Sequence, residues 1–93
     1  MERNICAAIG DQSVLEFLYK GTSRSVEPHT LGYNGKGILT LCAWQLTGGS
    51  GEDWRDFHLN GISELRVTDR KFIRARPGYN PNDTTMTRVL CRL

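Results

Sequence analysis

The feature that most constrains the fold is the run of residues 37–46, which is apolar on both faces when it is read as a strand. Only Thr40 on one face and Gln45 on the other are plainly polar. A buried helix could share this composition, but turn-forming residues 34–37 and 48–51 bound the run closely on both sides. A strand that is apolar on both faces needs cover on both faces, so this one belongs in the middle of a small barrel or sandwich.

The segments around this run predict further strands. Residues 13–20 alternate between apolar and polar positions, and residues 24–34 are extended but contain Pro28, which marks a sheet edge or a bulge. Residues 54–59 and 63–68 predict two more strands, joined by a tight turn of 3-10 type, with Leu65 and Val67 facing inward. Residues 2–11 predict a short helix. The sequence therefore predicts a mainly β domain with a five-stranded barrel.

The C-terminal residues 76–93 extend this barrel. Residues 77–83 form a loop, and residues 86–93 fit two patterns. Alternation of Val89, Cys91 and Leu93 indicates a strand, whereas Met86, Val89 and Leu93 would also lie on one side of a helix. We favour the strand. The chain is then one domain of residues 1–93, with a barrel core over about residues 4–75.

Composition limits the class of protein. A chain of 93 residues with 39% hydrophobic and 24% charged residues is typical of a globular domain. No apolar run approaches the roughly 18 residues of a membrane span, and the N-terminus lacks a signal-peptide pattern. We expect a cytoplasmic protein without a membrane partner. The cysteines are odd in number and far apart, so Cys6, Cys42 and Cys91 are expected to be apolar core residues rather than disulfide partners or metal ligands.

Positive charge is concentrated in one segment. The net charge is only +2, but residues 66–76 contain five Lys and Arg residues against Asp69 alone. Such an excess suits an anionic partner. It also suits a solvated sheet edge that charge protects from aggregation, and composition leaves both interpretations open.

Cationic and aromatic side chains alternate along the predicted strands. Guanidinium groups hold phosphates in a bidentate fork, and aromatic faces stack on bases. Small β-barrels bind nucleotides or single-stranded nucleic acid with this pairing of residue types. In the alternative interpretation, the aromatics are core residues and the arginines are surface charge. The candidate contact residues are Tyr19, Arg24, His29, Trp44, Arg55 and His58.

No enzyme motif is present, and no cofactor or metal site is predicted. His29 and His58 could meet beside Asp56 or Glu27 as a base with an orienting partner. No nucleophile stands at a suitable spacing, so we expect a protein that is not an enzyme.

Residues 15–21, residues 24–31 with their Val-Glu-Pro-His sequence, and residues 54–62 together resemble the WYL domain. The resemblance covers about residues 4–75. It implies an SH3-like (Sm-like) β-barrel that senses a nucleic-acid or nucleotide-like ligand, usually behind the DNA-binding domain of a bacterial transcription regulator. It implies pocket positions at Tyr19, Arg24, His29 and Arg55.

Two positions depart from the family pattern. The tripeptide that names the family falls on Leu39-Thr40-Leu41, so only its leucine remains, and a usual arginine is replaced by Gly61. Trp44 lies on the strand face of Thr40 and could supply the missing aromatic surface. We therefore expect a regulatory, ligand-sensing domain. The alternative is an interaction module without a small ligand, which forms a homodimer or binds a regulatory DNA-binding protein.

Overall fold

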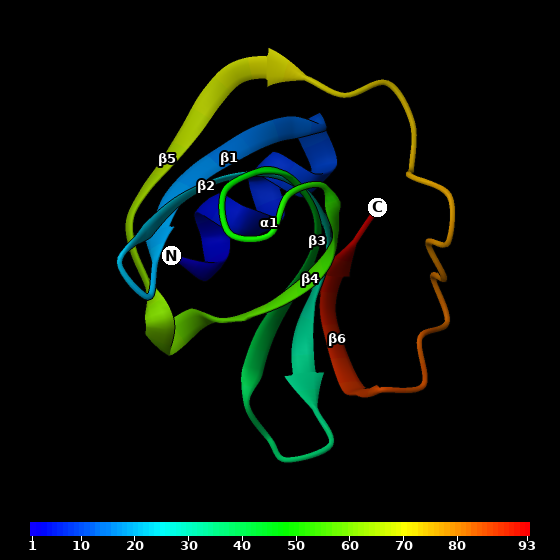
Figure 1. Cartoon of the computed structure of the whole chain (residues 1–93). Helices are drawn as coiled ribbons and strands as arrows, with labels where there is room; N and C mark the ends of the chain where they lie inside the picture. Colours follow the sequence, from blue (N-terminus) through cyan, green and yellow to red (C-terminus); the bar gives the residue numbers. More distant parts are fainter.

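The structure is a computed structural model that describes all of residues 1–93. It contains one helix, a 3-10 turn and six strands in a single antiparallel sheet (Figure 1). The elements in chain order are α1 Glu2–Asp11, β1 Ser13–Tyr19, β2 Thr22–Asn34, β3 Leu39–Thr47, β4 Asp53–His58, the turn η1 Leu59–Gly61, β5 Ile62–Lys71 and β6 Met86–Arg92. The predicted mainly β class, the helix, and the strand at the C-terminus are confirmed.

The run that is apolar on both faces forms β3, which pairs with β2 on one side and β4 on the other. Leu41 and Ala43 point into the core and are completely buried. Thr40, on the other face, is only 2% exposed. The prediction of a strand covered on both sides is therefore confirmed.

The longest strand, β2, holds the sheet together. One edge pairs with β3, while the other edge pairs with β1 in its first half and with β6 in its second half. The register against β3 shifts between Pro28 and Thr30, so His29 is the extra residue of a bulge. Pro28 predicts either a sheet edge or a bulge, and the structure has the bulge.

The sheet curls strongly but does not close. Its strand order is β4-β3-β2-β1-β5, and β4 and β5 do not pair, although η1 connects them. The expected barrel is therefore not closed, because the sheet is open, and the predicted C-terminal strand β6 joins it beside β2. Val67 of β5 was expected to be buried but is 46% exposed, because an edge strand has no neighbour on one side.

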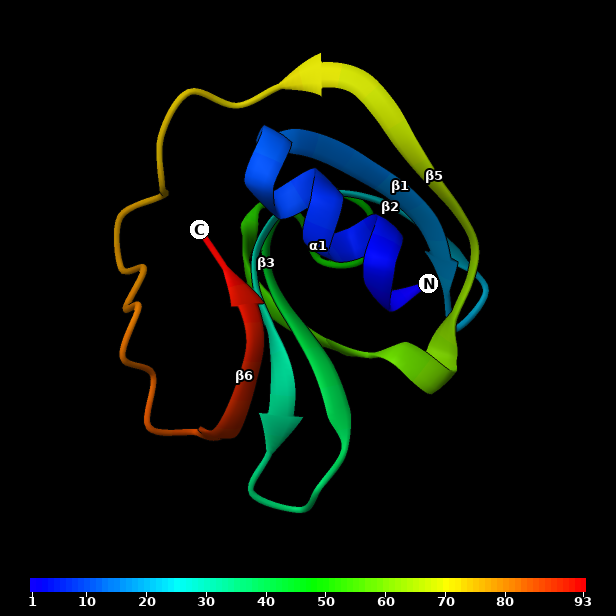
Figure 2. The same cartoon turned by 180° about the vertical axis from the view of Figure 1, so that it is seen from behind.

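Helix α1 covers one end of the curled sheet (Figure 2), and the loop between β3 and β4 lies at the other end (Figure 1). With ten residues, α1 is too short to cross a membrane, and no other helix is long or apolar enough. The residues that form the core between these two ends are Ile5, Ala8, Ile9, Leu15, Phe17, Tyr19, Val26, Leu31, Leu41, Ala43, Phe57, Leu59 and Ile62.

The cysteine expectation is wrong for two of the three residues. Cys6 of α1 and Cys91 of β6 form a disulfide across a sequence separation of 85 residues. Cys42 remains free and half-buried, and burial together with the Asp56 carboxylate raises the pKa of its thiol to about 12. The odd number and wide spacing of the cysteines did not predict this disulfide. Cys91 reaches the helix only because β6 returns along β2.

Candidate functional site

Arg24 of β2 is held in a fixed position at the loop end of the sheet. Its Nη1 donates a hydrogen bond of 2.8 Å to Oε1 of Gln45. Its guanidinium carbon lies 5.7 Å from the ring centroid of Tyr19 and 5.8 Å from that of Phe57. The Nε of Arg24 is buried and has no hydrogen-bond partner. Such an atom is uncommon, because buried donors are nearly always paired.

The glycine-rich loop of residues 48–51 is fastened beside Arg24. The buried Gln45 amide donates from Nε2 to the carbonyl oxygens of Gly48 at 2.7 Å and Gly51 at 2.8 Å. Gly48 has a φ of +104°, and a Cβ there would lie 2.4 Å from the carbonyl oxygen of Ser23. Only glycine fits this combination of left-handed backbone and close approach.

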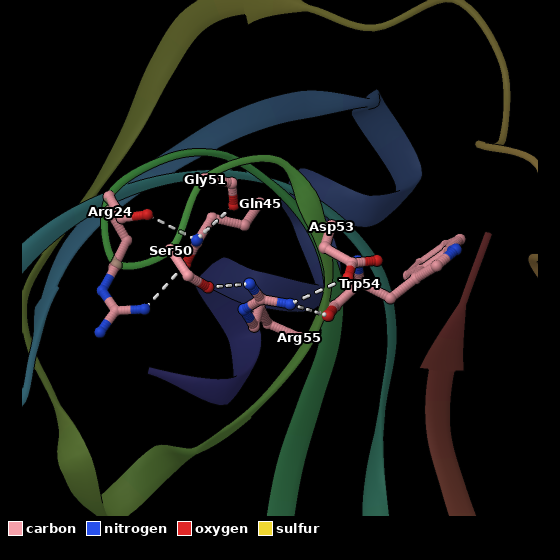
Figure 3. A network of polar contacts seen from close by, with 8 residues as sticks. Arg24, Gln45, Ser50, Gly51, Asp53, Trp54 and Arg55 are labelled. Atoms are coloured by element: carbon pink, nitrogen blue, oxygen red, sulfur yellow. Dashed lines mark hydrogen bonds and ion pairs between the residues drawn. The ribbon is translucent and has the colours of Figure 1, made fainter.

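Arg55 of β4 lies on the other side of the same loop (Figure 3). Its Nη1 donates to the carbonyl oxygen of Trp54 at 2.9 Å and lies 3.4 Å from the Asp53 carboxylate. Its Nη2 donates to the hydroxyl of Ser50. The side chain is 28% exposed, so the guanidinium is positioned by the protein but reaches solvent.

Tyr19 lies beside Arg24 and is itself immobilised. Its ring meets that of Phe57 edge-on at 5.0 Å, and its hydroxyl oxygen accepts a hydrogen bond from the backbone N–H of His58 at 3.2 Å. Lys20 Nζ lies 5.5 Å from the tyrosine ring centroid. We refer to Tyr19, Lys20, Arg24 and Arg55 with the loop 48–51 as the Arg24–Arg55 site.

The Arg24–Arg55 site is an open surface. The larger cavities lie elsewhere, and neither arginine lines any of them. The site contains three cations, and one of them, Arg55, pairs with the Asp53 carboxylate. A ligand that binds here would lie along the surface rather than inside a pocket.

His29 was expected to contact a ligand, but it is completely buried. Its Nδ1 is 2.8 Å from the carbonyl oxygen of Glu27, and its Nε2 accepts the backbone N–H of Arg76 at 3.1 Å. The ring is therefore neutral with its proton on Nδ1, and burial lowers its pKa. Because both nitrogens are engaged within the protein, His29 has no free group for a ligand.

Trp44 lies away from the two arginines as well, on the outer face of β3. Its ring meets Trp54 edge-on at 5.7 Å, and the Arg76 guanidinium lies 5.3 Å from its centroid. Arg76 also binds the Glu27 carboxylate through two hydrogen bonds of 2.7 and 3.1 Å. We call the rings that pack together here the outer aromatic cluster: His29, Trp44, Trp54, Phe72 and Tyr79.

His58 lies apart from both the Arg24–Arg55 site and the outer aromatic cluster. It lines a cavity of about 420 Å³ together with Asp56 and Lys36. The expected meeting of His29 with His58 does not occur there, because His29 is not part of this cavity. The structure thus brings Tyr19, Arg24 and Arg55 together and separates them from the side chains of His29, Trp44 and His58. No group of three or more His, Cys, Asp and Glu side chains is arranged to hold a metal ion.

The basic segment 66–76 is largely engaged in internal contacts. Arg66 and Arg70 both pair with Glu16, and the hydrogen bond from Arg66 is the main cause that lowers the pKa of this carboxyl group. Arg76 pairs with Glu27, and Lys71 donates to the hydroxyl of Ser13 at 2.9 Å. These contacts favour the interpretation of this segment as a charged sheet edge.

Several contributors to the Arg24–Arg55 site were not predicted as contact residues: Lys20, Gln45, Phe57 and the loop 48–51. The sequence shows Gln45 only as a polar exception on a buried face. That exception was the available signal, because a buried amide must find partners. A fixed guanidinium that reaches solvent, such as that of Arg55, can bind an oxyanion when further cations lie beside it. No family model, curated protein or solved structure matches this chain in the comparisons.

Proposed function

We propose that the chain is a non-enzymatic sensing domain of the WYL type that binds a phosphate-bearing ligand at the Arg24–Arg55 site. The observation that carries the proposal is the pair of guanidinium groups beside the loop 48–51: Arg24 is fixed against two aromatic rings, and Arg55 is held by Ser50 and is 28% exposed. Phosphate oxygens are strong acceptors for guanidinium donors. The curled sheet, in which β5 returns beside β1, supports the SH3-like architecture that the resemblance implies.

The open form of the site favours a short single-stranded nucleic acid over a free nucleotide. A nucleotide is usually enclosed by a pocket, whereas a strand lies along a surface and contacts it through successive phosphates. Arg24 and Arg55, on either side of one loop, offer two such contact points, and Lys20 offers a third. Binding of this ligand would regulate a DNA-binding partner in the cytoplasm, as the WYL resemblance implies.

Replacing Arg55 tests the proposal. Arg55→Ala should weaken binding of a labelled oligonucleotide by about tenfold or more, because a positioned charge is lost. It should also reduce the slope of log affinity against log salt by about 0.7, the value for one phosphate contact with a single strand. Fluorescence anisotropy titrations at several salt concentrations measure both quantities, and circular dichroism checks the fold.

Arg3→Ala is the matched control, because it removes the same charge from an exposed position on α1, at the opposite end of the sheet. Its affinity should stay close to that of the wild type. Equal losses in the two variants would show that binding depends on net charge alone, and unchanged affinity in Arg55→Ala would refute the assignment.

An interaction module remains the second candidate, and one observation favours it. Val67 of the edge strand β5 is 46% exposed, and Ile73, just beyond the end of β5, is 88% exposed. Apolar side chains at an open sheet edge invite pairing with another chain. Light scattering during size-exclusion chromatography, with a thermal-shift screen of oligonucleotides, separates the two functions: a stable dimer without any shift supports the interaction module.

A further inference from the structure

A second site lies on the side of the sheet away from Arg24 and Arg55. A cavity of about 250 Å³ separates the outer face of β3 and β4 from the chain that connects β5 to β6. Trp54 and Tyr79 contribute aromatic walls, and Cys42, Asn80 and Asp83 contribute polar ones. Trp54 and Arg55 point to opposite sides of β4 (Figure 3), so the two sites do not share a surface.

Internal contacts hold both aromatic walls in place. Trp54 donates from Nε1 to the carbonyl oxygen of Pro77 at 2.9 Å, and the Tyr79 hydroxyl donates to the carbonyl oxygen of Leu93 at 2.8 Å. Both rings pack on His29, with centroid distances of 4.7 and 5.3 Å. Because their polar groups are already engaged, these side chains offer a ligand their aromatic carbon surface.

The one charged side chain that lines the cavity is acidic. Asp83 is half-buried in its wall, and no Lys, Arg or His lines it. The Asp83 Oδ1 accepts hydrogen bonds from the Thr85 N–H at 2.9 Å and from the Thr85 hydroxyl at 2.7 Å, which fix the carboxylate. Burial is the main cause of the raised pKa of Cys42, and the charges of Asp56 and Asp83 raise it further. The negative potential of these two carboxylates therefore reaches the cavity wall.

We propose that this cavity binds a small organic cation, an ammonium or quaternary ammonium group. Two aromatic side chains and a carboxylate around one space attract such a group through cation–π and ionic interactions. The same carboxylate repels phosphate, so this ligand differs in chemistry from that of the Arg24–Arg55 site. A volume of about 250 Å³ lies below the usual range for drug-sized ligands and suits a small amine.

Choline and its uncharged carbon isostere form a direct test, because they differ in charge but hardly in shape. Isothermal titration calorimetry should give at least about tenfold tighter binding of choline, since the isostere lacks the cation–π and ionic interactions. Choline should also change the fluorescence of Trp54. Equal affinities for the two compounds, or no binding of choline at millimolar concentration, would overturn the proposal.

Variants of the cavity wall locate the binding. Asp83→Asn keeps the side-chain shape and the Oδ1 acceptor but removes the charge, and it should weaken choline binding about tenfold. Asp69→Asn, the matched control, removes an exposed carboxylate that does not line this cavity, and it should have no effect. Trp54→Phe keeps an aromatic ring of weaker cation affinity and should lower the affinity severalfold. Wild-type affinity in Asp83→Asn would contradict the assignment.

Arg55→Ala and Asp83→Asn together test whether the two ligands bind at separate sites. Arg55→Ala should lose oligonucleotide binding and retain choline binding, whereas Asp83→Asn should show the reverse. Parallel loss of both ligands in a variant whose circular dichroism matches the wild type would exclude two separate sites.

Discussion

At the residue scale, three buried polar side chains organise this small protein. Gln45 fastens the glycine-rich loop, Glu27 holds Arg76, and His29 links β2 to the chain that follows β5. The sequence shows each of them as a polar residue in an apolar or extended context. It does not predict their partners, because the hydrogen bonds of His29 and Glu27 to Arg76 join residues 47 and 49 positions apart.

The neutral state of His29 predicts that stability depends on pH. Burial lowers the pKa of His29 from 6.5, so the unfolded chain takes up a proton that the folded protein excludes. The unfolded state then binds more protons below about pH 6.5, and the free energy of unfolding should fall as the pH drops through that value, by at most about 1.4 kcal/mol per unit. Above that pH the contribution should be constant.

Urea unfolding between about pH 7.5 and pH 5 measures this dependence. His29→Gln should flatten it. The carboxylate of Glu16 does not interfere, because its pKa is lowered from 4.5 and its contribution is lost only at more acid pH. An unchanged pH dependence in His29→Gln would contradict the interpretation.

At the element scale, hydrophobic alternation and turn residues predicted nearly all of the secondary structure. The bounds of β1, β2 and β4 differ from the expectation by one or two residues. The sequence could not predict that the sheet stays open, because closure depends on pairing between β4 and β5, and no local pattern encodes it. It also could not place β6, whose position beside β2 depends on contacts far apart in the chain.

β6 approaches β2 closely at Gly32. A Cβ at this position would lie 2.4 Å from the carbonyl oxygen of Arg88 and 3.1 Å from the Cα of Val89. Gly32→Ala should therefore push β6 outward and lower the free energy of unfolding by about 1 to 3 kcal/mol. Urea unfolding and faster hydrogen exchange of the β6 amides would report this.

Gly35→Ala is the matched control, because nothing lies within 4 Å of a Cβ at that position. It should leave both the stability and the exchange rates near those of the wild type. Normal protection of the β6 amides in Gly32→Ala would contradict this prediction, because it would show that the added Cβ does not displace the strand.

At the scale of the whole molecule, the open sheet carries the Arg24–Arg55 site on one side and the outer aromatic cluster on the other. The disulfide between Cys6 and Cys91 ties the helix to the last strand and so closes nearly the entire chain. Disulfides persist mainly in oxidising compartments. In a reducing cytoplasm, the expected location, these two thiols would be free.

Reduction of the disulfide should destabilise the protein. A closed loop of this length restricts the unfolded chain, and the chain-entropy model gives a stabilisation of about 4 to 5 kcal/mol. Urea unfolding with and without a dithiol reductant should therefore show a lower midpoint after reduction. The double variant Cys6→Ala/Cys91→Ala should unfold at the same urea concentration under both conditions. An identical midpoint for the wild type under both conditions would exclude the bond.

The link between Cys6 and Cys91 gives residues 6–91 the covalent connectivity of a ring. A single break in the backbone between these residues, for example in the exposed hairpin before β3, would leave all the atoms in one molecule. The two pieces would separate only when the sulfur bridge is also cut.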